Sequence, residues 1–247
     1  MAKPNVYKAR GAIDRRFPIW TQASSMSVTT PTKSESSLGE TVRVVIHALI
    51  IALVIRTFLF QPFNIPSGSM KATLLVGDYL FVSKYSYGYS HFSIPQSPNL
   101  FAGRIFGSEP RRGDIVVFRL PRDRKTHYLK RVVGLPGDRV QMIKGRLSLN
   151  GELVPVELAP VQVSVPDDKT SPRTYVEKLG GTSYSILKAD SGNGFSDNTP
   201  EFVVPAGNLF VLGDNRDNST DSRHQSPTYG VGFVPAELVI GRIVLSF

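Results

Sequence analysis

The chain contains no cysteine and only four histidines among its 247 residues. Without cysteine there are no disulfides, no thiolate zinc sites, no iron–sulfur clusters and no cysteine nucleophile. The histidines do not have the spacing of metal ligands, so the sequence predicts no metal and no cofactor. Most of them lie in turn-rich or apolar segments, which disfavours a Ser–His mechanism. The four are His47, His91, His127 and His224.

Negative charge is also scarce, because 20 Asp and Glu oppose 29 Lys and Arg and leave a formal net charge of +9. A basic balance favours nucleic acid or an anionic membrane surface as a partner. Seven basic and three acidic residues lie in the first 43 positions, whereas residues 63–247 carry 21 basic and 17 acidic ones. No basic stripe with interleaved aromatics stands out beyond the tail, so the sequence predicts no nucleic-acid partner.

The segment VVIHALIIALVI (44–55) is the long apolar run of the chain. It is shorter than the ~18–20 residues of a usual membrane span. Counting Arg56 as a snorkelling residue extends it to Phe60. Because a basic tail precedes the run and a turn-rich segment follows it, we expect an uncleaved transmembrane signal anchor at 43–62. A buried core helix and a cleaved signal peptide are the alternatives, although no Ala-x-Ala-like exit follows the run.

The positive-inside rule then sets the expected topology. Residues 1–42 form a flexible cytoplasmic tail, in which either Met1 or Met26 could be the first residue. Residues 63–247 lie on the periplasmic or extracytoplasmic side of the inner (cytoplasmic) membrane. The lipid bilayer is therefore a predicted partner of a single-pass protein.

Period-2 apolar segments bounded by Gly and Pro recur after the anchor and predict strands. Asn150-Gly151 is a strong hairpin-turn signal. Helical periodicity is nearly absent there, so the expected fold is mostly β, an antiparallel β-sheet domain preceded by one N-terminal transmembrane helix. Residues 155–200 are expected to form an inserted β-rich subdomain. The predicted strands cover 79–85, 114–120, 128–134, 139–143, 146–154, 201–205, 209–213 and 237–247.

Without cysteine, the available nucleophiles are hydroxyl groups, and lysine is the alternative base to histidine. Lys130 lies in the apolar segment YLKRVVG (128–134), where alternation puts it on one face and Arg131 on the other. We expect one of these two charges to point inward, although a solvated face is the commoner fate of a lysine. A lysine base at neutral pH needs its pKa lowered by about 3 units from ~10.4, which costs roughly 4–5 kcal/mol.

Five segments together resemble the bacterial type I signal peptidases, or leader peptidases, and occur in that family's order. These enzymes are membrane-anchored Ser/Lys endopeptidases that remove signal peptides from exported preproteins. Any one segment alone would be a weak signal. The segments are FNIPSGSM (63–70), GDYLFVSKYSYG (77–88), RRGDIVVF (111–118), YLKRVVGLPGDRV (128–140) and 213–235, which begins with GDNRDNSTDSR and ends with a YGFVP-like sequence.

The resemblance implies a role for individual residues. Ser69 matches the nucleophile, and Lys130 matches the general base that takes its proton. Ser67 matches the hydroxyl that forms the oxyanion hole with the Ser69 backbone N–H, and Ser219 matches the serine that orients the base. A supporting polar network is implied for Asp214, Arg216, Asp221 and Arg223. Shallow pockets for small substrate side chains are implied for Phe63, Ile65, Leu74, Tyr128 and Leu129.

The same resemblance implies cleavage after Ala-x-Ala type sites, with preprotein signal peptides as partners and a functional contact with the export machinery. No cofactor is implied. Many relatives have Met-x-Pro-Thr-Leu after the nucleophile, whereas this chain has Met70-Lys71-Ala72-Thr73-Leu74, so Lys71 is a second candidate base. Two other functions remain open: a tethered β module that binds peptides without chemistry, and a related Ser/Lys protease with one dedicated client.

Overall fold

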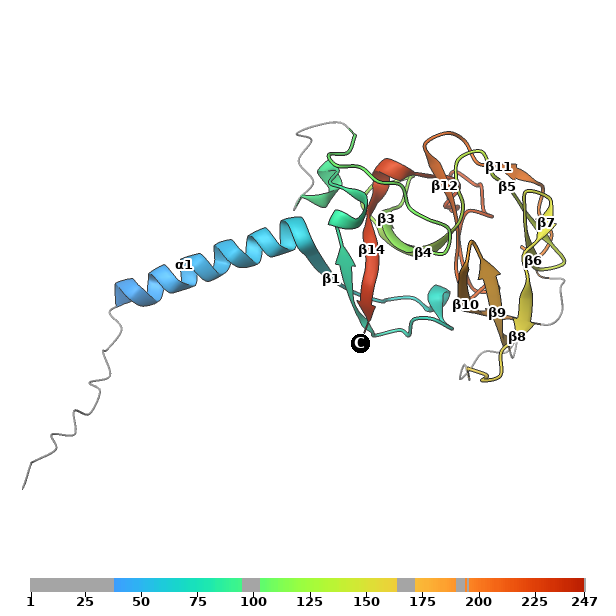
Figure 1. Cartoon of the computed structure of the whole chain (residues 1–247), viewed down its shortest axis with the longest axis horizontal. Coiled ribbons are helices and arrows are strands. Elements are labelled where there is room, and N and C mark those ends of the chain that lie inside the picture. The colour runs from blue at the N-terminus through green and yellow to red at the C-terminus, as the bar shows by residue number, and fades with distance from the viewer. Residues whose placement is uncertain (1–37, 95–102, 164–171, 190–193, 195, 247) are drawn as a thin grey trace, which may run out of the picture. The chain divides into compact units, whose positions relative to one another are not determined.

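The computed structural model describes residues 38–94, 103–163, 172–189, 194 and 196–246. The chain divides into two units, residues 1–43 and 44–247, and all the strands belong to the second. Most of the predicted tail lies outside the described residues. The expectation of a mostly β fold with one N-terminal apolar helix is confirmed (Figure 1).

The apolar run forms helix α1, Leu38–Val54, which continues as a π-helical turn at Ile55–Leu59. The resulting 22-residue helix is long and apolar enough to cross a membrane. None of its residues is buried in the described structure, which is not the environment of a soluble core helix. The helix begins five residues before the predicted span of 43–62. It ends three residues before the end of that span, because the chain becomes extended at Phe60.

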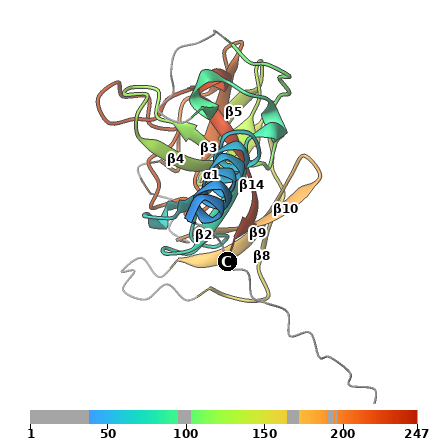
Figure 2. The same cartoon turned by 90° about the vertical axis from the view of Figure 1, so that its left-hand side faces the viewer.

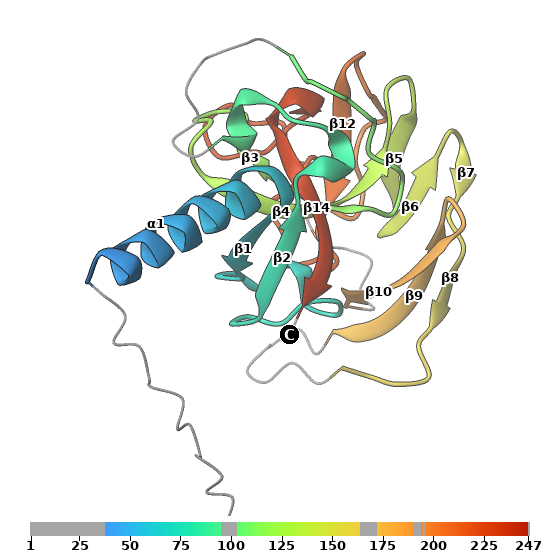
Figure 3. The same cartoon turned by 60° about the vertical axis from the view of Figure 1, so that its left-hand side comes forward.

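The largest sheet has seven strands in the order β1-β2-β14-β3-β4-β12-β13. Its pairs are antiparallel, and the register shifts in β14 against both β2 and β3 where the sheet curls (Figure 3). The predicted strands are recovered, but β1 falls within and just after the predicted anchor and was not foreseen. The strands are β1 Phe60–Asn64, β2 Tyr79–Ser83, β3 Ile115–Arg119, β4 His127–Gly134, β12 Asn208–Leu212, β13 Val234–Pro235 and β14 Val239–Ser246.

Two smaller antiparallel sheets complete the fold. One has the order β11-β5-β6-β7, with β5 Arg139–Ile143, β6 Arg146–Leu149, β7 Glu152–Leu153 and β11 Phe202–Val203. Its turn between β6 and β7 is the predicted one, since Asn150 and Gly151 have φ angles of 53° and 87°.

The other sheet, β10-β9-β8, forms the expected β-rich insertion and contains a long hairpin (Figure 2). Its strands are β8 Val156–Leu158, β9 Arg173–Leu179 and β10 Thr182–Lys188. Apolar side chains from this sheet, from β5 and β6 and from one face of β4 and β12 pack into a single cluster. The insertion is therefore part of the core rather than a separate surface appendage.

Candidate active site

A cleft of about 530 Å³ lies between strand β1 with the turn that follows it and the first half of β4. Residues 127–130 of β4 pair with β3 on one side, whereas β12 pairs only from Arg131 onward. Strand β1 pairs with β2 and is the outer strand of its sheet. Both borders of the cleft therefore present strand edges to which an extended peptide could add.

Ser69 and Lys130 meet at the floor of this cleft. Ser69 lies in a single 3-10 turn, Gly68–Met70, that follows the extended residue Ser67. The Nζ of Lys130 donates a hydrogen bond to the Ser69 Oγ at 2.5 Å. Lys130 is 3% exposed, so bulk water has almost no access to its ammonium group.

The surroundings of Lys130 favour its neutral form. Burial lowers the pKa of Lys130 to about 8, and the positive charge of Arg223 acts in the same direction. The carboxylates of Asp221 and Asp214 oppose part of this shift. A lysine with such a pKa has a substantial neutral fraction at mildly basic pH, and only the neutral amine can accept a proton.

Two further hydroxyl groups lie beside this pair. The Ser67 Oγ is 3.4 Å from the Ser69 Oγ. Ser219 lies against Gly213 and the Ser69 backbone, because a Cβ placed on Gly213 would be 2.2 Å from the Ser219 Oγ and 2.6 Å from the Ser69 carbonyl oxygen. The Ser219 Oγ is buried and has no hydrogen-bond partner among the described residues, so the implied bond to Lys130 is not formed here. Only glycine fits at position 213.

Asn215 holds the turn that carries Ser69. Its backbone N–H donates to the Ser69 carbonyl oxygen at 3.0 Å, and its Nδ2 donates to the Gly68 carbonyl oxygen at 3.2 Å. Sequence reasoning did not single out Asn215, although it lies inside the GDNRDNSTDSR segment. None of the catalytic roles implied by the resemblance called for a carboxamide, so nothing in the sequence distinguished Asn215 from its neighbours.

Arg131 points away from the cleft but is as deeply buried as its neighbour. Its guanidinium donates to both carboxylate oxygens of Asp214, at 2.8 and 2.6 Å, and lies 3.9 Å over the ring of Tyr184. The expectation was that one of Lys130 and Arg131 points inward, and the structure goes further because both are buried. Both faces of β4 are covered, one by the turn of Ser69 and the other by the insertion, so both charges are inside.

The remaining network residues divide into two ion pairs. Arg223 pairs with Asp221, whose Oδ2 also accepts the backbone N–H of Gly213 at 3.0 Å. Arg216 pairs instead with Glu177 of β9, through contacts of 2.9 and 2.5 Å. Sequence reasoning missed Glu177, because the insertion carries no motif and this contact joins residues far apart in the chain.

Four of the five residues implied for substrate pockets line the cleft: Phe63, Ile65, Tyr128 and Leu129. Leu74 does not line it. Its side chain is 3% exposed and packs beneath the cleft with Ile65, Met70 and Leu80.

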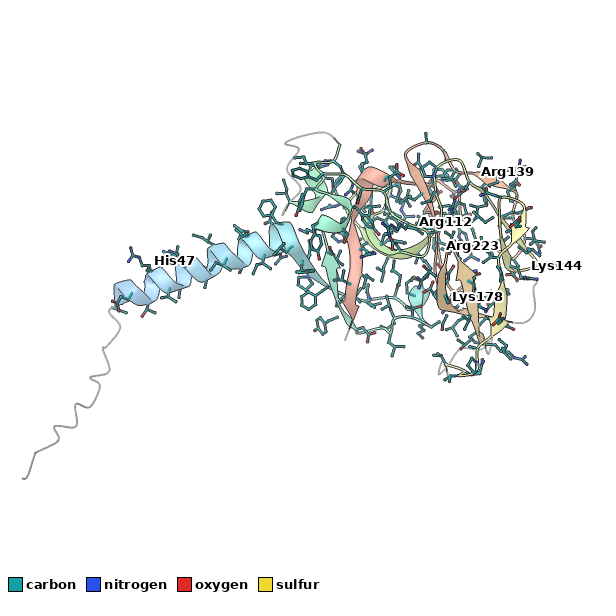
Figure 4. All side chains as sticks on the ribbon, in the orientation of Figure 1. His47, Arg112, Arg139, Lys144, Lys178 and Arg223 are labelled. Carbon is teal, nitrogen blue, oxygen red and sulfur yellow. The ribbon has the colours of Figure 1, made fainter. Side chains whose placement is uncertain are left out.

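The alternative bases make different contacts from those of Lys130. The side chain of Lys71 packs beside Gly68, where a Cβ on that glycine would be 3.0 Å from the Lys71 Cε. His127 lines the cleft and contacts the Phe63 ring edge-on, and burial lowers its pKa with help from Arg119. His47 projects from helix α1 (Figure 4). No group of three His, Cys, Asp or Glu in the described part of the chain could hold a metal ion.

Comparison with known proteins shows the family to which the chain belongs. A family model described as "Signal peptidase, peptidase S26" matches residues 38–247. The chain is 42% identical over 219 residues to a signal peptidase I of Rickettsia typhi (strain ATCC VR-144 / Wilmington), covering 85% of this chain and 80% of that protein. It is 40% identical to a signal peptidase I of Rickettsia canadensis (strain McKiel), covering 88% and 82% of the two chains.

Among solved structures, a signal peptidase I from Enterococcus faecalis V583 is similar at 27% identity and a TM-score of 0.31. That similarity covers 56% of this chain and 98% of the other. The family match spans both strands that border the cleft and the segments that carry Ser69 and Lys130. The chain therefore belongs to the signal peptidase I family, peptidase S26, and is a hydrolase of the serine-protease type.

Proposed function

We propose that this protein cleaves signal peptides from exported preproteins after Ala-x-Ala type sites, with Ser69 as nucleophile and Lys130 as general base. The observation that carries the proposal is the 2.5 Å contact between the Lys130 Nζ and the Ser69 Oγ inside a cleft. Membership of the family supports signal-peptide cleavage as the reaction.

The chemistry follows from this contact. Neutral Lys130 takes the proton of the Ser69 hydroxyl as its Oγ attacks the substrate carbonyl carbon. The Ser67 hydroxyl and the Ser69 backbone N–H stabilise the resulting oxyanion. Lys130 then returns the proton to the departing amine, which leaves an ester between Ser69 and the signal peptide. Water hydrolyses that ester, with Lys130 accepting a proton once more.

Substrate recognition fits the two free strand edges of the cleft. An extended peptide adds to these edges through its backbone, and alternate side chains then point to the floor. Phe63, Ile65, Tyr128 and Leu129 line shallow apolar pockets there, with Leu74 packed behind them. Such pockets favour small side chains at the positions −1 and −3 from the cleaved bond.

The helix at 38–59 supports a membrane-anchored mode of action. We place residues 1–42 in the cytoplasm and residues 63–247 on the outer side of the inner membrane, with the insertion at 155–200 as part of that domain. A signal peptide is itself apolar, so anchoring enzyme and substrate in one bilayer raises their effective concentration. This arrangement also puts the cleft close to the export machinery.

The test is cleavage of a purified preprotein with an Ala-x-Ala site by full-length, detergent-solubilised protein. We expect Ser69→Ala and Lys130→Ala to abolish cleavage and Lys71→Ala to retain it. If Lys130→Ala cleaves and Lys71→Ala does not, the base is Lys71. If the wild-type protein fails on several such substrates, a single-client protease or a tethered binding module is the better interpretation.

A further inference from the structure

The cleft has two ends, and only one of them holds Ser69 and Lys130. At the other end the ring of His127 lies edge-on to that of Phe63, with 5.2 Å between the ring centroids, and both residues line the cleft. His127 comes three residues before Lys130 in β4, which corresponds to about 10 Å along the strand. The proposed reaction uses neither His127 nor the turn that precedes it.

An extended substrate reaches this end of the cleft with the residues before its cleaved bond. Tyr128 and Leu129 line the proposed pockets for such residues, and in β4 they stand between His127 and Lys130. The part of the substrate that precedes the cleaved bond therefore runs towards His127. Three residues of an extended chain span about 10 Å. With residue −1 at Ser69, residue −4 thus lies beside His127.

The turn that leads into His127 is strongly basic. It connects β3 to β4, and Arg119, the last residue of β3, lies directly opposite His127 in the register of the two strands. We refer to residues 119–126 as the basic turn, since they include four basic residues and one acidic residue. Three of the cations, Arg122, Arg124 and Lys125, are exposed. Together these charges give this end of the cleft a positive potential.

The single carboxylate of the basic turn is engaged within the turn itself. Asp123 accepts hydrogen bonds from the Thr126 hydroxyl at 2.6 Å and from the backbone N–H groups of Lys125 and Thr126 at 2.8 and 3.0 Å. These bonds lower the pKa of Asp123 to about 2. The Arg119 guanidinium in turn donates to the Arg124 carbonyl oxygen at 3.0 Å. The turn is therefore held in shape by its own hydrogen bonds.

His127 adds a neutral polar group to this charged end of the cleft. Burial and the facing charge of Arg119 both lower the pKa of His127 from its ordinary value of 6.5, so the ring is uncharged at pH 7. A neutral imidazole has one N–H donor and one acceptor nitrogen. It can donate to a carboxylate or an amide of a bound peptide, whereas an ammonium group would meet the positive potential of the basic turn.

We propose that His127 and the basic turn form a subsite that accepts acidic and neutral polar side chains at position −4 of the signal peptide and rejects lysine and arginine there. This inference rests on the function proposed above, because it uses the same cleft and the same direction of the substrate. The charges act while the peptide enters the cleft, so the discrimination falls on binding rather than on the chemical step.

The experiment uses the full-length protein in detergent and three forms of one preprotein, with Asp, Gln or Lys at position −4 and the same Ala-x-Ala site. We expect kcat/KM to fall from the Asp to the Gln to the Lys substrate, by about tenfold overall and mostly through KM. The difference between the Asp and Lys substrates should nearly vanish at about 1 M salt, where the screening length is about 3 Å.

Reversing charges in the basic turn should reverse this order of substrates. The variant carries Arg122→Glu and Arg124→Glu, and its matched control carries Lys144→Glu and Arg146→Glu in the turn between β5 and β6. Arg124 and Lys144 are both exposed and have φ angles of 53° and 48°, and the arginine paired with each donates to a backbone carbonyl oxygen. Neither control residue is among those that line the cleft, so the control should keep the wild-type order.

His127→Leu tests the imidazole separately from the charges. It keeps an apolar contact with Phe63 and removes both ring nitrogens. We expect slower cleavage of the Asp and Gln substrates and an unchanged rate for the Lys substrate. Unchanged rates for all three substrates would exclude His127 from the subsite.

Two results would overturn the proposal as a whole: equal cleavage of the Asp and Lys substrates by the wild type, or a change by the same factor for all three substrates when the basic turn is reversed. Binding of signal-peptide fragments to Ser69→Ala protein gives a readout that does not need cleavage. A wild-type protein that cleaves no preprotein would refute the proposed function. Equal affinity of the Ser69→Ala protein for the Asp and Lys peptides would refute the subsite.

Discussion

The Nζ of Lys130 lies 2.5 Å from the Oγ of Ser69, although 61 positions separate the two residues in the sequence. The lysine reaches this position from the first half of β4, where the turn of Ser69 covers it and leaves it 3% exposed. Burial disfavours an ammonium ion, and the same burial makes the amine available as a base. The site therefore gains reactivity from an arrangement that destabilises the fold.

Replacing Lys130 by Met should separate these two effects. The pKa of Lys130 is about 8 in the folded protein and near 10.5 for an ordinary lysine. The charged side chain therefore opposes folding fully below pH 8, and this cost disappears as the pH rises towards 10.5. We expect Lys130→Met to be inactive but more stable by about 3 kcal/mol at neutral pH, measured by denaturant unfolding.

The control for this prediction is Lys71→Met, which removes a partly exposed lysine from the same turn. Lys71→Met should not raise the free energy of unfolding by a comparable amount at any pH. Equal stability of Lys130→Met and wild type at pH 7 would mean that the folded site accommodates the ammonium without cost.

The rate of cleavage should rise with pH along a limb centred near pH 8, because only neutral Lys130 can take the proton of Ser69. The measurement is the pH dependence of kcat/KM for one preprotein substrate, which reports groups of the free enzyme. Lys71→Ala should leave the midpoint of this limb in place. A midpoint close to that of an ordinary lysine would contradict the assignment of a buried base.

Ser219→Ala tests a buried hydroxyl that has no partner in the described structure. Because no hydrogen bond is lost, we expect unchanged or slightly raised stability, within about 1 kcal/mol. We also expect kcat to fall about tenfold or more, since hydrogen bonds to a catalytic base often tighten only when substrate is bound. Thermal unfolding and initial cleavage rates measure the two effects.

Ser222 provides the comparison, because its buried Oγ accepts the Val211 N–H at 2.9 Å. Ser222→Ala leaves that amide unsatisfied and should cost about 1–3 kcal/mol in stability. If Ser219→Ala loses as much stability as Ser222→Ala, its hydroxyl has a structural partner. If its kcat stays at the wild-type level, Ser219 does not orient Lys130.

Breaking the buried pair of Arg216 and Glu177 should destabilise the fold much more than breaking a surface pair of the sheet that contains Glu177. Glu177→Gln leaves a buried guanidinium without its counter-ion, and we expect a loss of about 3–5 kcal/mol in the free energy of unfolding. The matched variant is Glu157→Gln, which breaks the exposed pair with Lys178 and should cost less than about 1 kcal/mol. Similar losses in the two variants would show that the insertion does not depend on its buried ion pair.

Local patterns in the sequence predicted much of the fold. Period-2 runs located the main strands of the large sheet. Asn150-Gly151 marked the hairpin between β6 and β7 in the four-stranded sheet, because both positions require a positive φ. Strand β1 was not predicted, because the apolar run extends into it and hydropathy does not distinguish the end of a helix from the start of a strand. The insertion was identified by its position and composition, but its packing into the core was not.

The site was predicted through resemblance more than through spacing. Alternation placed Lys130 and Arg131 on opposite faces of β4, but it could not show that both faces are covered. Glu177 and Asn215 act through contacts between distant segments, and no local pattern encodes such contacts. Ala72 has a φ angle of 95°, and no pattern predicted this left-handed conformation, because an alanine does not indicate a positive φ as a glycine does.

The adjacency of Lys130 and Arg131 has a consequence for the alignment of β4 within its sheet. A slip of one residue would exchange the two faces and present a guanidinium to Ser69. A guanidinium keeps its proton at every physiological pH, so the slipped arrangement would be catalytically silent. The ion pair between Arg131 and Asp214, on the far side of the strand, opposes such a slip. The insertion packs Tyr184 against the same guanidinium. It thereby helps to fix the register of β4, on which the reaction at the opposite face of the sheet depends.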